Sequence, residues 1–320
     1  MPELPEVETI RRQLAPLVQG RRVLRLEVLD PRWSRPLAPA ELERALTGRR
    51  IERLGRRGKY LLWSFDGDVH LAQHLRMTGA VLADPEPEPA HVRVRMQLGR
   101  RAGTRGVLLV FDDPRRFGTG ELLAGGEALE AFLAARLGLE PFDAGFTVEH
   151  LRALARGRTA PVKAMLLDQR LIAGVGNIYA DEALFRAQVH PRRAAGSLTA
   201  AQWARVREGV ITALSAGIDA RGASIDDFRH VDGVRGSFQD QFLVHLRAGE
   251  PCVCCGRTIV KLTVAGRGTY VCESCQPRPR GARRGAGAGG RERSAEAALR
   301  RPNEPAVRPA ARSGRRPAPR

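Results

Sequence analysis

The chain has 320 residues and a formal net charge of +18, because 53 Lys and Arg stand against 35 Asp and Glu. Apolar residues make up 43% of it, enough to fill the cores of two domains. No run is long and apolar enough to cross a membrane, and the polar start lacks the apolar segment of a signal peptide. The composition argues against a membrane or secreted protein. We expect a soluble cytoplasmic protein with a polyanionic partner such as nucleic acid.

The first residues carry a candidate nucleophile. The chain starts Met1-Pro2-Glu3, and removal of the initiator methionine would leave Pro2 with a secondary amine. Such an amine can form an iminium with an aldehyde-like carbon, and a pKa of roughly 8 keeps part of it unprotonated near neutral pH. Glu3 is an adjacent proton donor or acceptor. The alternative is that Pro2 is only a processing signal ahead of a helix that starts at Pro5.

That helix is predicted in either case. Apolar residues recur at helical spacing: Val7, Ile10, Leu14 and Leu17. A helix here would hold the terminal amine on a rigid element, as a reactive group requires.

The part of the chain that follows this helix is predicted to form β-strands. Short β-rich segments are separated by Gly, Pro or charged turns, at residues 60–65, 69–75, 92–98 and 107–111. Several strands at this spacing predict a β-sandwich. Residues 85–89, with three prolines and two glutamates, are expected to form a surface loop.

From about residue 138 the pattern becomes helical. We predict helices over 147–155 and 165–171, and a longer one that ends near Gly217. Its apolar face carries Trp203, Val206, Val210 and Leu214. The domain boundary is expected near residues 138–145, and a cleft between a β domain and a helical domain is a common place for a ligand.

All five cysteines lie between Cys252 and Cys275. Cys252 and Cys255 form one pair and Cys272 and Cys275 form another, with sixteen residues between the pairs. This spacing is typical of a four-thiolate zinc site on a ribbon. The alternative, disulfides or free thiols, is disfavoured by the paired spacing and the intracellular context. Cys254 is interpreted as a spare thiol.

A hairpin is predicted between the two cysteine pairs, from residues 258–264 and 268–271. Its turn, residues 265–268, would present Arg267. Lysine usage adds a second indication: the chain has 50 arginines and only three lysines, at Lys59, Lys163 and Lys261. Because a guanidinium does not lose its proton in proteins, these lysines are candidates for work that arginine cannot do. Chance survival is the alternative for any one of them.

Six motifs, in one order, carry a resemblance to a known family. They are MPELPEVET at residues 1–9, RGKYLL at 57–62, HLRMTG at 74–79, DPRRFG at 113–118, GVGNIYA at 174–180 and the cysteine cluster. Over about residues 1–276 the chain resembles the bacterial formamidopyrimidine-DNA glycosylases of the formamidopyrimidine-DNA glycosylase and endonuclease VIII family. The resemblance implies a monomeric DNA repair enzyme that acts on damaged double-stranded DNA and holds one structural Zn²⁺.

The resemblance also implies an architecture, an α+β multidomain protein. Residues 1–138 would form an N-terminal catalytic β-sandwich domain with flanking helices, and residues 139–235 a helix-two-turn-helix DNA-binding domain. Residues 236–276 would form the zinc-ribbon hairpin. Residues 277–320 hold 13 Arg and 3 Glu without an aromatic residue, the composition of a disordered basic tail.

Catalytic roles follow from the same resemblance. Pro2 would attack C1′ of the damaged nucleotide, and Glu3 would protonate or steady the opening sugar. Lys59 would shuttle protons and hold phosphate, and Arg267 would assist the second elimination. The implied reaction is removal of an oxidised purine, 8-oxoguanine or a formamidopyrimidine, followed by β,δ-elimination.

DNA contacts are implied at seven further positions. The target base must leave the stack and the hole must be filled, and the family's wedge positions are Met77, Arg115 and Phe117. Positions linked with phosphate or backbone contact are Arg158, Lys163 and Asn177, with His91 as a weaker candidate. His74 is interpreted as a structural residue of its loop.

The chain departs from the family pattern mainly in residues 221–247, which correspond to the loop that closes over the everted base. Two alternatives therefore stay open. One is an endonuclease VIII-type glycosylase for oxidised pyrimidines, disfavoured by Leu4 and the complete wedge. The other is a catalytically silent zinc-ribbon DNA-binding protein, disfavoured by Pro2, Glu3 and Lys59 together.

Overall fold

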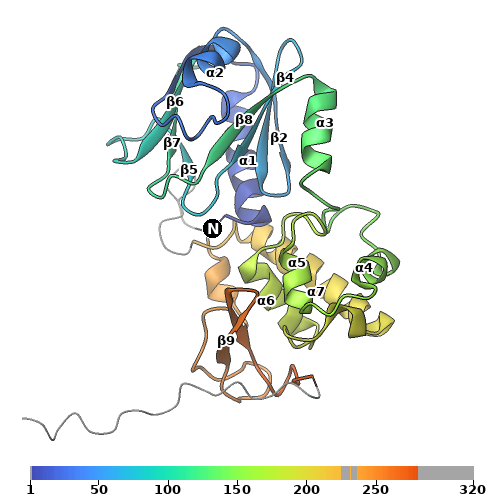
Figure 1. Cartoon of the computed structure of the whole chain (residues 1–320). Helices are drawn as coiled ribbons and strands as arrows, with labels where there is room; N and C mark the ends of the chain where they lie inside the picture. The colour runs from blue at the N-terminus through green and yellow to red at the C-terminus, as the bar shows by residue number, and fades with distance from the viewer. Residues whose placement is uncertain (1, 102, 225–230, 232–235, 280–320) are drawn as a thin grey trace, which may run out of the picture. The chain divides into compact units, whose positions relative to one another are not determined.

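The opening helix α1 (Leu4–Val18) joins the two halves of the protein. In this computed structural model, which describes residues 2–101, 103–224, 231 and 236–279, α1 starts where the β-sandwich meets the helical half (Figure 1). Leu4 belongs to the core of the helical half, whereas Val7, Ile10 and Leu14 belong to the core of the sandwich. The predicted apolar face is correct except at Leu17, which is 37% exposed, because Val18 is the residue that turns inward.

Two four-stranded antiparallel sheets form the sandwich, as predicted. One has the order β1-β6-β7-β5 and the other the order β2-β3-β4-β8. Their strands are β1 (Val23–Val28), β2 (Ile51–Arg57), β3 (Tyr60–Phe65), β4 (Val69–His74), β5 (Ala80–Ala83), β6 (Val92–Leu98), β7 (Val107–Asp112) and β8 (Thr119–Ala124). The two inner faces, α1 and α2 (Pro39–Leu46) share one apolar core. Helix α3 (Gly126–Ala134) packs in a separate apolar cluster with Ala72 of β4 and Leu123 of β8. Residues 85–89 lie outside the strands, as expected.

The helical half contains α4 (Val148–Ala155), α5 (Val162–Leu167), α6 (Asn177–Arg186) and α7 (Ala200–Asp219). The helix predicted over 165–171 is misplaced, because it begins at Val162 and ends before Asp168. The side chain of Asp168 accepts a hydrogen bond from the Arg170 amide at 3.1 Å, a local bond that favours a turn over a continuing helix. The longer helix α7 buries Trp203, Val206, Val210 and Leu214, as predicted.

Two short 3-10 helices complete the helical part: Ala195–Ser197 before α7 and Phe238–Gln241 after it. The ribbon then contains strands β9 (Val260–Val264) and β10 (Arg267–Val271). Its turn is only two residues long. Ala265 and Gly266 both have positive φ angles, 49° and 71°, as this kind of tight hairpin turn requires. Arg267 is therefore the first residue of β10 and not part of the turn, which corrects the expected turn.

Candidate active site

A cleft of about 380 Å³ brings together residues from distant parts of the chain. Its wall includes Glu3 from the start of α1, Lys59 from the β2–β3 turn, and Asn177 from the start of α6. Arg267 from β10 and Met77 from the loop after β4 complete the set of predicted residues that line it. These five residues meet because α1, the sandwich and the ribbon all contact this one space.

Glu3 is fixed by the positive end of a helix. Its carboxylate accepts hydrogen bonds from the amides of Ile178 at 3.0 Å and Tyr179 at 3.5 Å, at the first turn of α6. A helix N-terminus attracts negative charge through its free N–H groups and its dipole. Glu3 is only 2% exposed. Its carboxylate fits against the backbone of Gly176 because glycine has no Cβ, and a Cβ at position 176 would overlap the carboxylate. The chain thus holds an oriented carboxylate next to Pro2.

Glu6 supports this arrangement from one helical turn below. It accepts hydrogen bonds from the Glu3 amide at 2.8 Å, the Tyr179 hydroxyl at 2.7 Å and the Ala223 amide at 2.8 Å. Burial, and then the nearby charge of Glu3, raise the pKa of Glu6. Its bonds tie the first turn of α1 to α6 and to the chain after α7.

Lys59 has the environment of a proton-transfer group. It follows Gly58, which has a φ of +57°, and its side chain is buried beside the two carboxylates. Burial lowers the pKa of Lys59 and Arg267 lowers it further, whereas Glu3 and Glu6 oppose the shift. A lowered pKa lets a lysine release its proton more readily than an ordinary lysine does.

Glu140 holds the turn that carries Lys59. Its carboxylate accepts hydrogen bonds from the Gly58 amide at 2.5 Å and from the Arg56 guanidinium at 2.7 and 3.0 Å. Arg56 also bonds Glu8 of α1 at 3.1 Å. These largely buried groups fix the β2–β3 turn between α1 and the chain that follows α3.

Two loops present the candidate wedge residues side by side. Thr78 donates to the Asp113 carboxylate at 2.6 Å, which joins the loop after β4 to the loop after β7. Phe117 is 52% exposed, and the guanidinium of Arg115 lies 5.0 Å from the centre of its ring. Met77 is half-buried and lines the cleft. An exposed aromatic ring beside a planar cation suits insertion into a base stack.

His74 is a structural residue, as interpreted from the sequence. Its Nδ1 accepts a hydrogen bond from the Arg76 amide at 2.9 Å, so it fixes the loop that leads to Met77. Burial, followed by the charges of Arg76 and Lys59, lowers the pKa of His74 to about 3. The ring is therefore neutral at physiological pH.

The structure does not place Lys163 at the surface for a direct phosphate contact, and this corrects the expectation for that residue. Its side chain is fully buried, and its Nζ donates to Asp181 at 2.7 Å and to Thr269 Oγ1 at 2.8 Å. The buried ion pair instead joins α5 and α6 to the ribbon hairpin. Asn177 adds a second link, because its Nδ2 donates to the Gly268 carbonyl at 3.0 Å.

The two other candidates for phosphate contact lie away from this cluster. Arg158 is exposed, and its Nε donates to the Leu154 carbonyl at 2.6 Å. His91 is exposed at the start of the segment that leads into β6. Neither lines the cleft.

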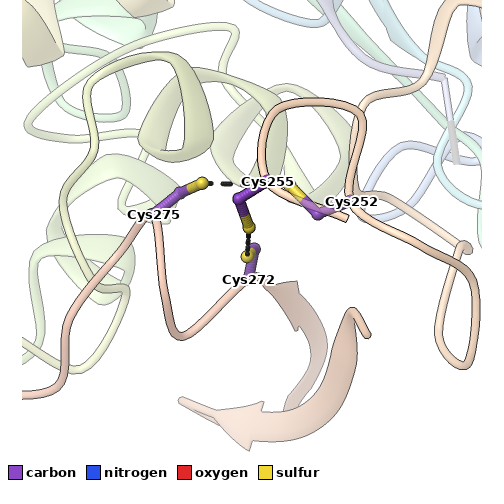
Figure 2. Close-up of side chains that lie close together, drawn as sticks. All are labelled: Cys252, Cys255, Cys272 and Cys275. Atoms are coloured by element: carbon purple, nitrogen blue, oxygen red, sulfur yellow. Dashed lines mark hydrogen bonds between the residues drawn. The ribbon is translucent and has the colours of Figure 1, made fainter. Parts of the chain in front are cut away.

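Four cysteines form a candidate metal centre beside the ribbon hairpin (Figure 2). The sulfur atoms of Cys252, Cys255, Cys272 and Cys275 all lie within 4.8 Å of one another. The Cys252–Cys275 and Cys255–Cys272 pairs are 3.9 and 3.5 Å apart. Tetrahedral Zn²⁺ with bonds of about 2.3 Å places its sulfurs roughly 3.8 Å apart, so the four thiolates fit this ion. Cys254 is exposed and stands outside the group, as interpreted.

Sequence reasoning missed several residues that build the site. Glu140 and Asp181 are carboxylates whose partners lie far away in the sequence, so no local pattern marks them. His245 also lines the cleft. The available signal for His245 was its place in the 221–247 stretch, where the chain departs from the family pattern.

Comparisons with known proteins agree with this architecture. The formamidopyrimidine-DNA glycosylase N-terminal domain matches residues 1–120, and the formamidopyrimidine-DNA glycosylase H2TH domain matches residues 137–229. The zinc finger found in FPG and IleRS matches residues 249–278, which contain the four clustered cysteines. A sandwich, an H2TH domain and a zinc finger in this order define a DNA glycosylase architecture with one structural Zn²⁺.

Individual relatives share most of the chain. The formamidopyrimidine-DNA glycosylases of Roseiflexus sp. and Chloroflexus aurantiacus are 43% and 45% identical to it, over 86% of this chain and 100% and 98% of theirs. The crystal structure of the MutM (Fpg) protein from Thermus thermophilus is 42% identical, with a TM-score of 0.76 over 86% of this chain and 98% of that one. A complex of Lactococcus lactis Fpg with abasic-site DNA is 35% identical, with a TM-score of 0.78 over 87% and 100%. This chain belongs to the formamidopyrimidine-DNA glycosylase family.

Proposed function

We propose that this chain is a bifunctional DNA glycosylase and abasic-site lyase that removes oxidised purines in base-excision repair. The observation that carries the proposal is the meeting of a helix-held Glu3 and a buried Lys59 with a lowered pKa in one cleft, directly beside Pro2. Family membership supports it, because the relatives are named formamidopyrimidine-DNA glycosylases.

The proposed chemistry starts with Pro2 as the terminal residue after removal of Met1, which itself lies outside the described residues. The secondary amine attacks C1′, the C1′–N bond to the damaged base breaks, and the base leaves as an anion that takes a proton from water. The Glu3 carboxylate accepts the proton that the amine releases and passes it to O4′, which opens the sugar ring and gives an iminium. The fixed position of its carboxylate at the start of α6 supports this role.

The iminium makes the neighbouring C2′–H acidic, so loss of this proton expels the 3′ phosphate in a β-elimination. A second proton loss expels the 5′ phosphate in a δ-elimination, which leaves a one-nucleotide gap with phosphate ends. Lys59 is proposed to move protons in these steps, and Arg267 to bind phosphate in the second. Both side chains line the same cleft as Glu3, which supports the assignment.

The substrate is damaged double-stranded DNA, and the enzyme acts on it as a monomer. We assign base-stack filling to Met77, Arg115 and Phe117, and backbone contact to Arg158, Asn177 and His91. Lys163 acts indirectly, through the ribbon hairpin that it holds. Solved relatives include a mutant of Lactococcus lactis Fpg bound to Fapy-dG-containing DNA and Lactococcus lactis Fpg bound to abasic-site DNA, which supports this class of substrate.

The location proposed for the enzyme is the bacterial cytoplasm, in association with DNA. Among the described helices, none is long and apolar enough to cross a membrane. The basic tail, residues 277–320, is proposed to add non-specific phosphate contacts; its residues from 280 onwards lie outside the described part of the chain.

Oxidised pyrimidines are a second candidate substrate, because one solved relative is a complex of wild-type Lactococcus lactis Fpg with oxidised-pyrimidine-containing DNA. Within the base-capping stretch 221–247, residues 225–230 and 232–235 lie outside the described residues.

Excision from matched duplexes tests the proposal. Duplexes with 8-oxoguanine, an oxidised pyrimidine or no lesion should give a one-nucleotide gap fastest with 8-oxoguanine and none with the undamaged strand. Pro2→Gly and Glu3→Gln should each abolish base removal while lesion-duplex binding persists. Faster excision of the pyrimidine would reassign the enzyme, and unchanged excision by either variant would refute the mechanism.

A further inference from the structure

The two loops that carry the candidate wedge residues lie side by side at one end of the sandwich. One loop, residues 75–79, leads from β4 to β5, and the other, residues 113–118, leads from β7 to β8. Each crosses from one sheet to the other, because β4 and β8 are neighbours in one sheet and β5 and β7 are neighbours in the other. Cross-strand pairs join the loop ends: His74 with Thr119, and Ala80 with Asp112. The strand register therefore places the two loops next to each other.

A buried carboxylate joins the middles of these two loops. Asp113 is fully buried, and its Oδ1 accepts a hydrogen bond from the Thr78 hydroxyl at 2.6 Å. Its Oδ2 accepts one from the Gly118 amide at 2.8 Å. The Thr78 oxygen also accepts a hydrogen bond from the Arg115 amide at 3.4 Å. One carboxylate and one hydroxyl thus connect the loop of Met77 to the backbone of the wedge arginine.

The same two loops pack on one aromatic ring. Gly79 and Gly118 both lie against Phe111 of β7: an added Cβ would be 2.7 Å from the ring at the first position and 2.4 Å from it at the second. Phe111 belongs to the buried core of the sandwich. Because a close-packed interior transmits a displacement and does not absorb it, a shift of one loop would carry over to the other.

We propose that Thr78 and Asp113 are positioning residues that hold Arg115 at the base opposite the lesion and so set the preference of the enzyme for that base. The proposal rests on the proposed function, because it needs Met77, Arg115 and Phe117 inside the base stack. Thr78 and Asp113 need not touch DNA, because they act through the backbone of Arg115. The bond between them also fixes the spacing of Met77 from the other two wedge residues.

The guanidinium of Arg115 is free to meet a base. It is exposed, forms no hydrogen bond or ion pair among the described residues, and lies 5.0 Å from the centre of the Phe117 ring. A guanidinium offers hydrogen-bond donors and no acceptor. Unpaired cytosine presents the acceptors O2 and N3 to it, whereas unpaired adenine presents N1 beside the amino donor N6. Arg115 therefore favours cytosine over adenine, provided that its position relative to that base is fixed.

Excision from two duplexes measures this preference. Full-length protein, in excess, is mixed with a duplex that carries 8-oxoguanine opposite cytosine, or with the same duplex carrying adenine in that place, and the single-turnover rates are compared. A well-placed arginine contact discriminates between bases by about 10-fold or more. The wild-type rate should be higher opposite cytosine by about this factor. Thr78→Val keeps the shape of the side chain but removes the hydroxyl, and it should lose most of the ratio.

Further variants identify the cause. Thr78→Ser keeps the hydroxyl and should keep the ratio. In an Arg115→Ala background the ratio should be low, and Thr78→Val should not lower it further, since no arginine is left to position. Thr212→Val is the matched control, because Thr212 also donates to a carboxylate, that of Glu208 at 3.4 Å, but on an exposed part of α7. It should keep the wild-type ratio. Thermal melting shows whether each variant is folded, and Thr78→Ala, which also lacks the hydroxyl, replaces Thr78→Val if the latter is unfolded.

The outcomes separate this inference from the proposed function. If Thr78→Val slows excision from both duplexes equally, the unchanged ratio shows that Thr78 does not position Arg115; the inference is then wrong and the glycosylase assignment stands. A wild type without a preference between cytosine and adenine would overturn the inference as well, and so would a ratio that Thr78→Val lowers further in the Arg115→Ala background. Failure of the wild type to excise 8-oxoguanine from either duplex would instead overturn the proposed function.

Discussion

Gly176→Ala should damage catalysis through one contact. Gly176 precedes α6 and has φ −127° and ψ −161°, a backbone conformation that alanine adopts freely. An added Cβ would lie 2.5 Å from Glu3 Oε1, and even closer to the other two carboxyl atoms. Ordinary contact begins near 3.4 Å, so the difference between 3.4 and 2.5 Å forces the carboxylate to move by at least about 0.9 Å.

This movement breaks the hydrogen bond from the Ile178 amide to Glu3, which is 3.0 Å long. A hydrogen bond to a charged group contributes about 1.5–3 kcal/mol, and the change from glycine to alanine offsets about 0.4–1 kcal/mol of its loss through the unfolded state. We expect a loss of about 1–2 kcal/mol in the free energy of unfolding. A displacement near 1 Å at a reacting group costs about 100-fold in rate.

Single-turnover excision of 8-oxoguanine measures the rate, and titration with a non-cleavable lesion duplex measures binding. Gly176→Ala should excise about 100-fold more slowly with little change in Kd. Gly126→Ala at the start of α3 is the matched control, because its added Cβ meets nothing closer than 3.9 Å. It should keep the wild-type rate. Excision by Gly176→Ala at the wild-type rate would contradict the role given to the Glu3 carboxylate.

Four further predictions follow from the same structure. Lys59→Arg should retain DNA affinity but slow elimination in a single-turnover assay, because the charge persists and the transferable proton does not. Elimination by Lys59→Arg at the wild-type rate would show that Lys59 acts only as a phosphate-binding cation. Lys59→Met should raise the free energy of unfolding near neutral pH, because burial lowers the pKa of Lys59 in the folded state and its charge therefore destabilises the fold. This destabilisation is complete below the folded-state pKa and disappears as the pH rises to the unfolded-state pKa of about 10.4. Urea melts in which the difference in unfolding free energy between variant and wild type does not narrow with rising pH would contradict this. Glu140→Gln should destabilise the protein by about 1.5–3 kcal/mol, since Arg56 loses charged hydrogen bonds to Glu140 but keeps Glu8 as a partner. A thermal melt close to that of wild type would argue against the role of Glu140 in holding the β2–β3 turn. Cys272→Ser should release the metal and weaken DNA binding while the sandwich, which has its own core, stays folded. Metal analysis should find one zinc per wild-type chain. A wild-type protein that is fully active without metal would show that the zinc ribbon is not needed for activity.

The basic tail gives a prediction of a different kind. Deletion of residues 277–320 removes 13 Arg and 3 Glu. Excision from a short lesion duplex should stay nearly unchanged, whereas the salt dependence of binding to undamaged DNA should become shallower. Equal salt slopes for the truncated and full-length chains would show that the tail does not engage DNA.

The sequence predicted what depends on local patterns. The β-sandwich was visible in the alternating strand Val92–Leu98, and the zinc centre in the spacing of Cys252 and Cys255. The strand β2 (Ile51–Arg57) escaped prediction because its alternation is broken: Glu52 and Arg53 are both exposed, at a register shift. The strand β1 has the same kind of break, because Leu24 and Arg25 are both exposed at a register shift.

The residues that connect distant segments could not be read from the sequence. The resemblance links Lys163 with phosphate or backbone contact, and only the fold shows that its Nζ donates to Asp181 and Thr269. Glu140 lies 82 residues from the Gly58 amide that it binds. Such pairs depend on how α1, the sandwich and the ribbon pack together, and no local periodicity encodes that packing.

Borohydride trapping tests the central claim most directly. Full-length protein is incubated with an 8-oxoguanine duplex and sodium borohydride, and the covalent protein–DNA product is resolved on a denaturing gel. Wild type should form a trapped complex with its N-terminal proline attached to the lesion strand. Pro2→Gly keeps a primary amine but should not remove the base, so it should give far less trapped complex on this duplex. Absence of any trapped wild-type complex, in a preparation that binds the same duplex and contains one zinc per chain, would contradict the imine mechanism proposed for this protein.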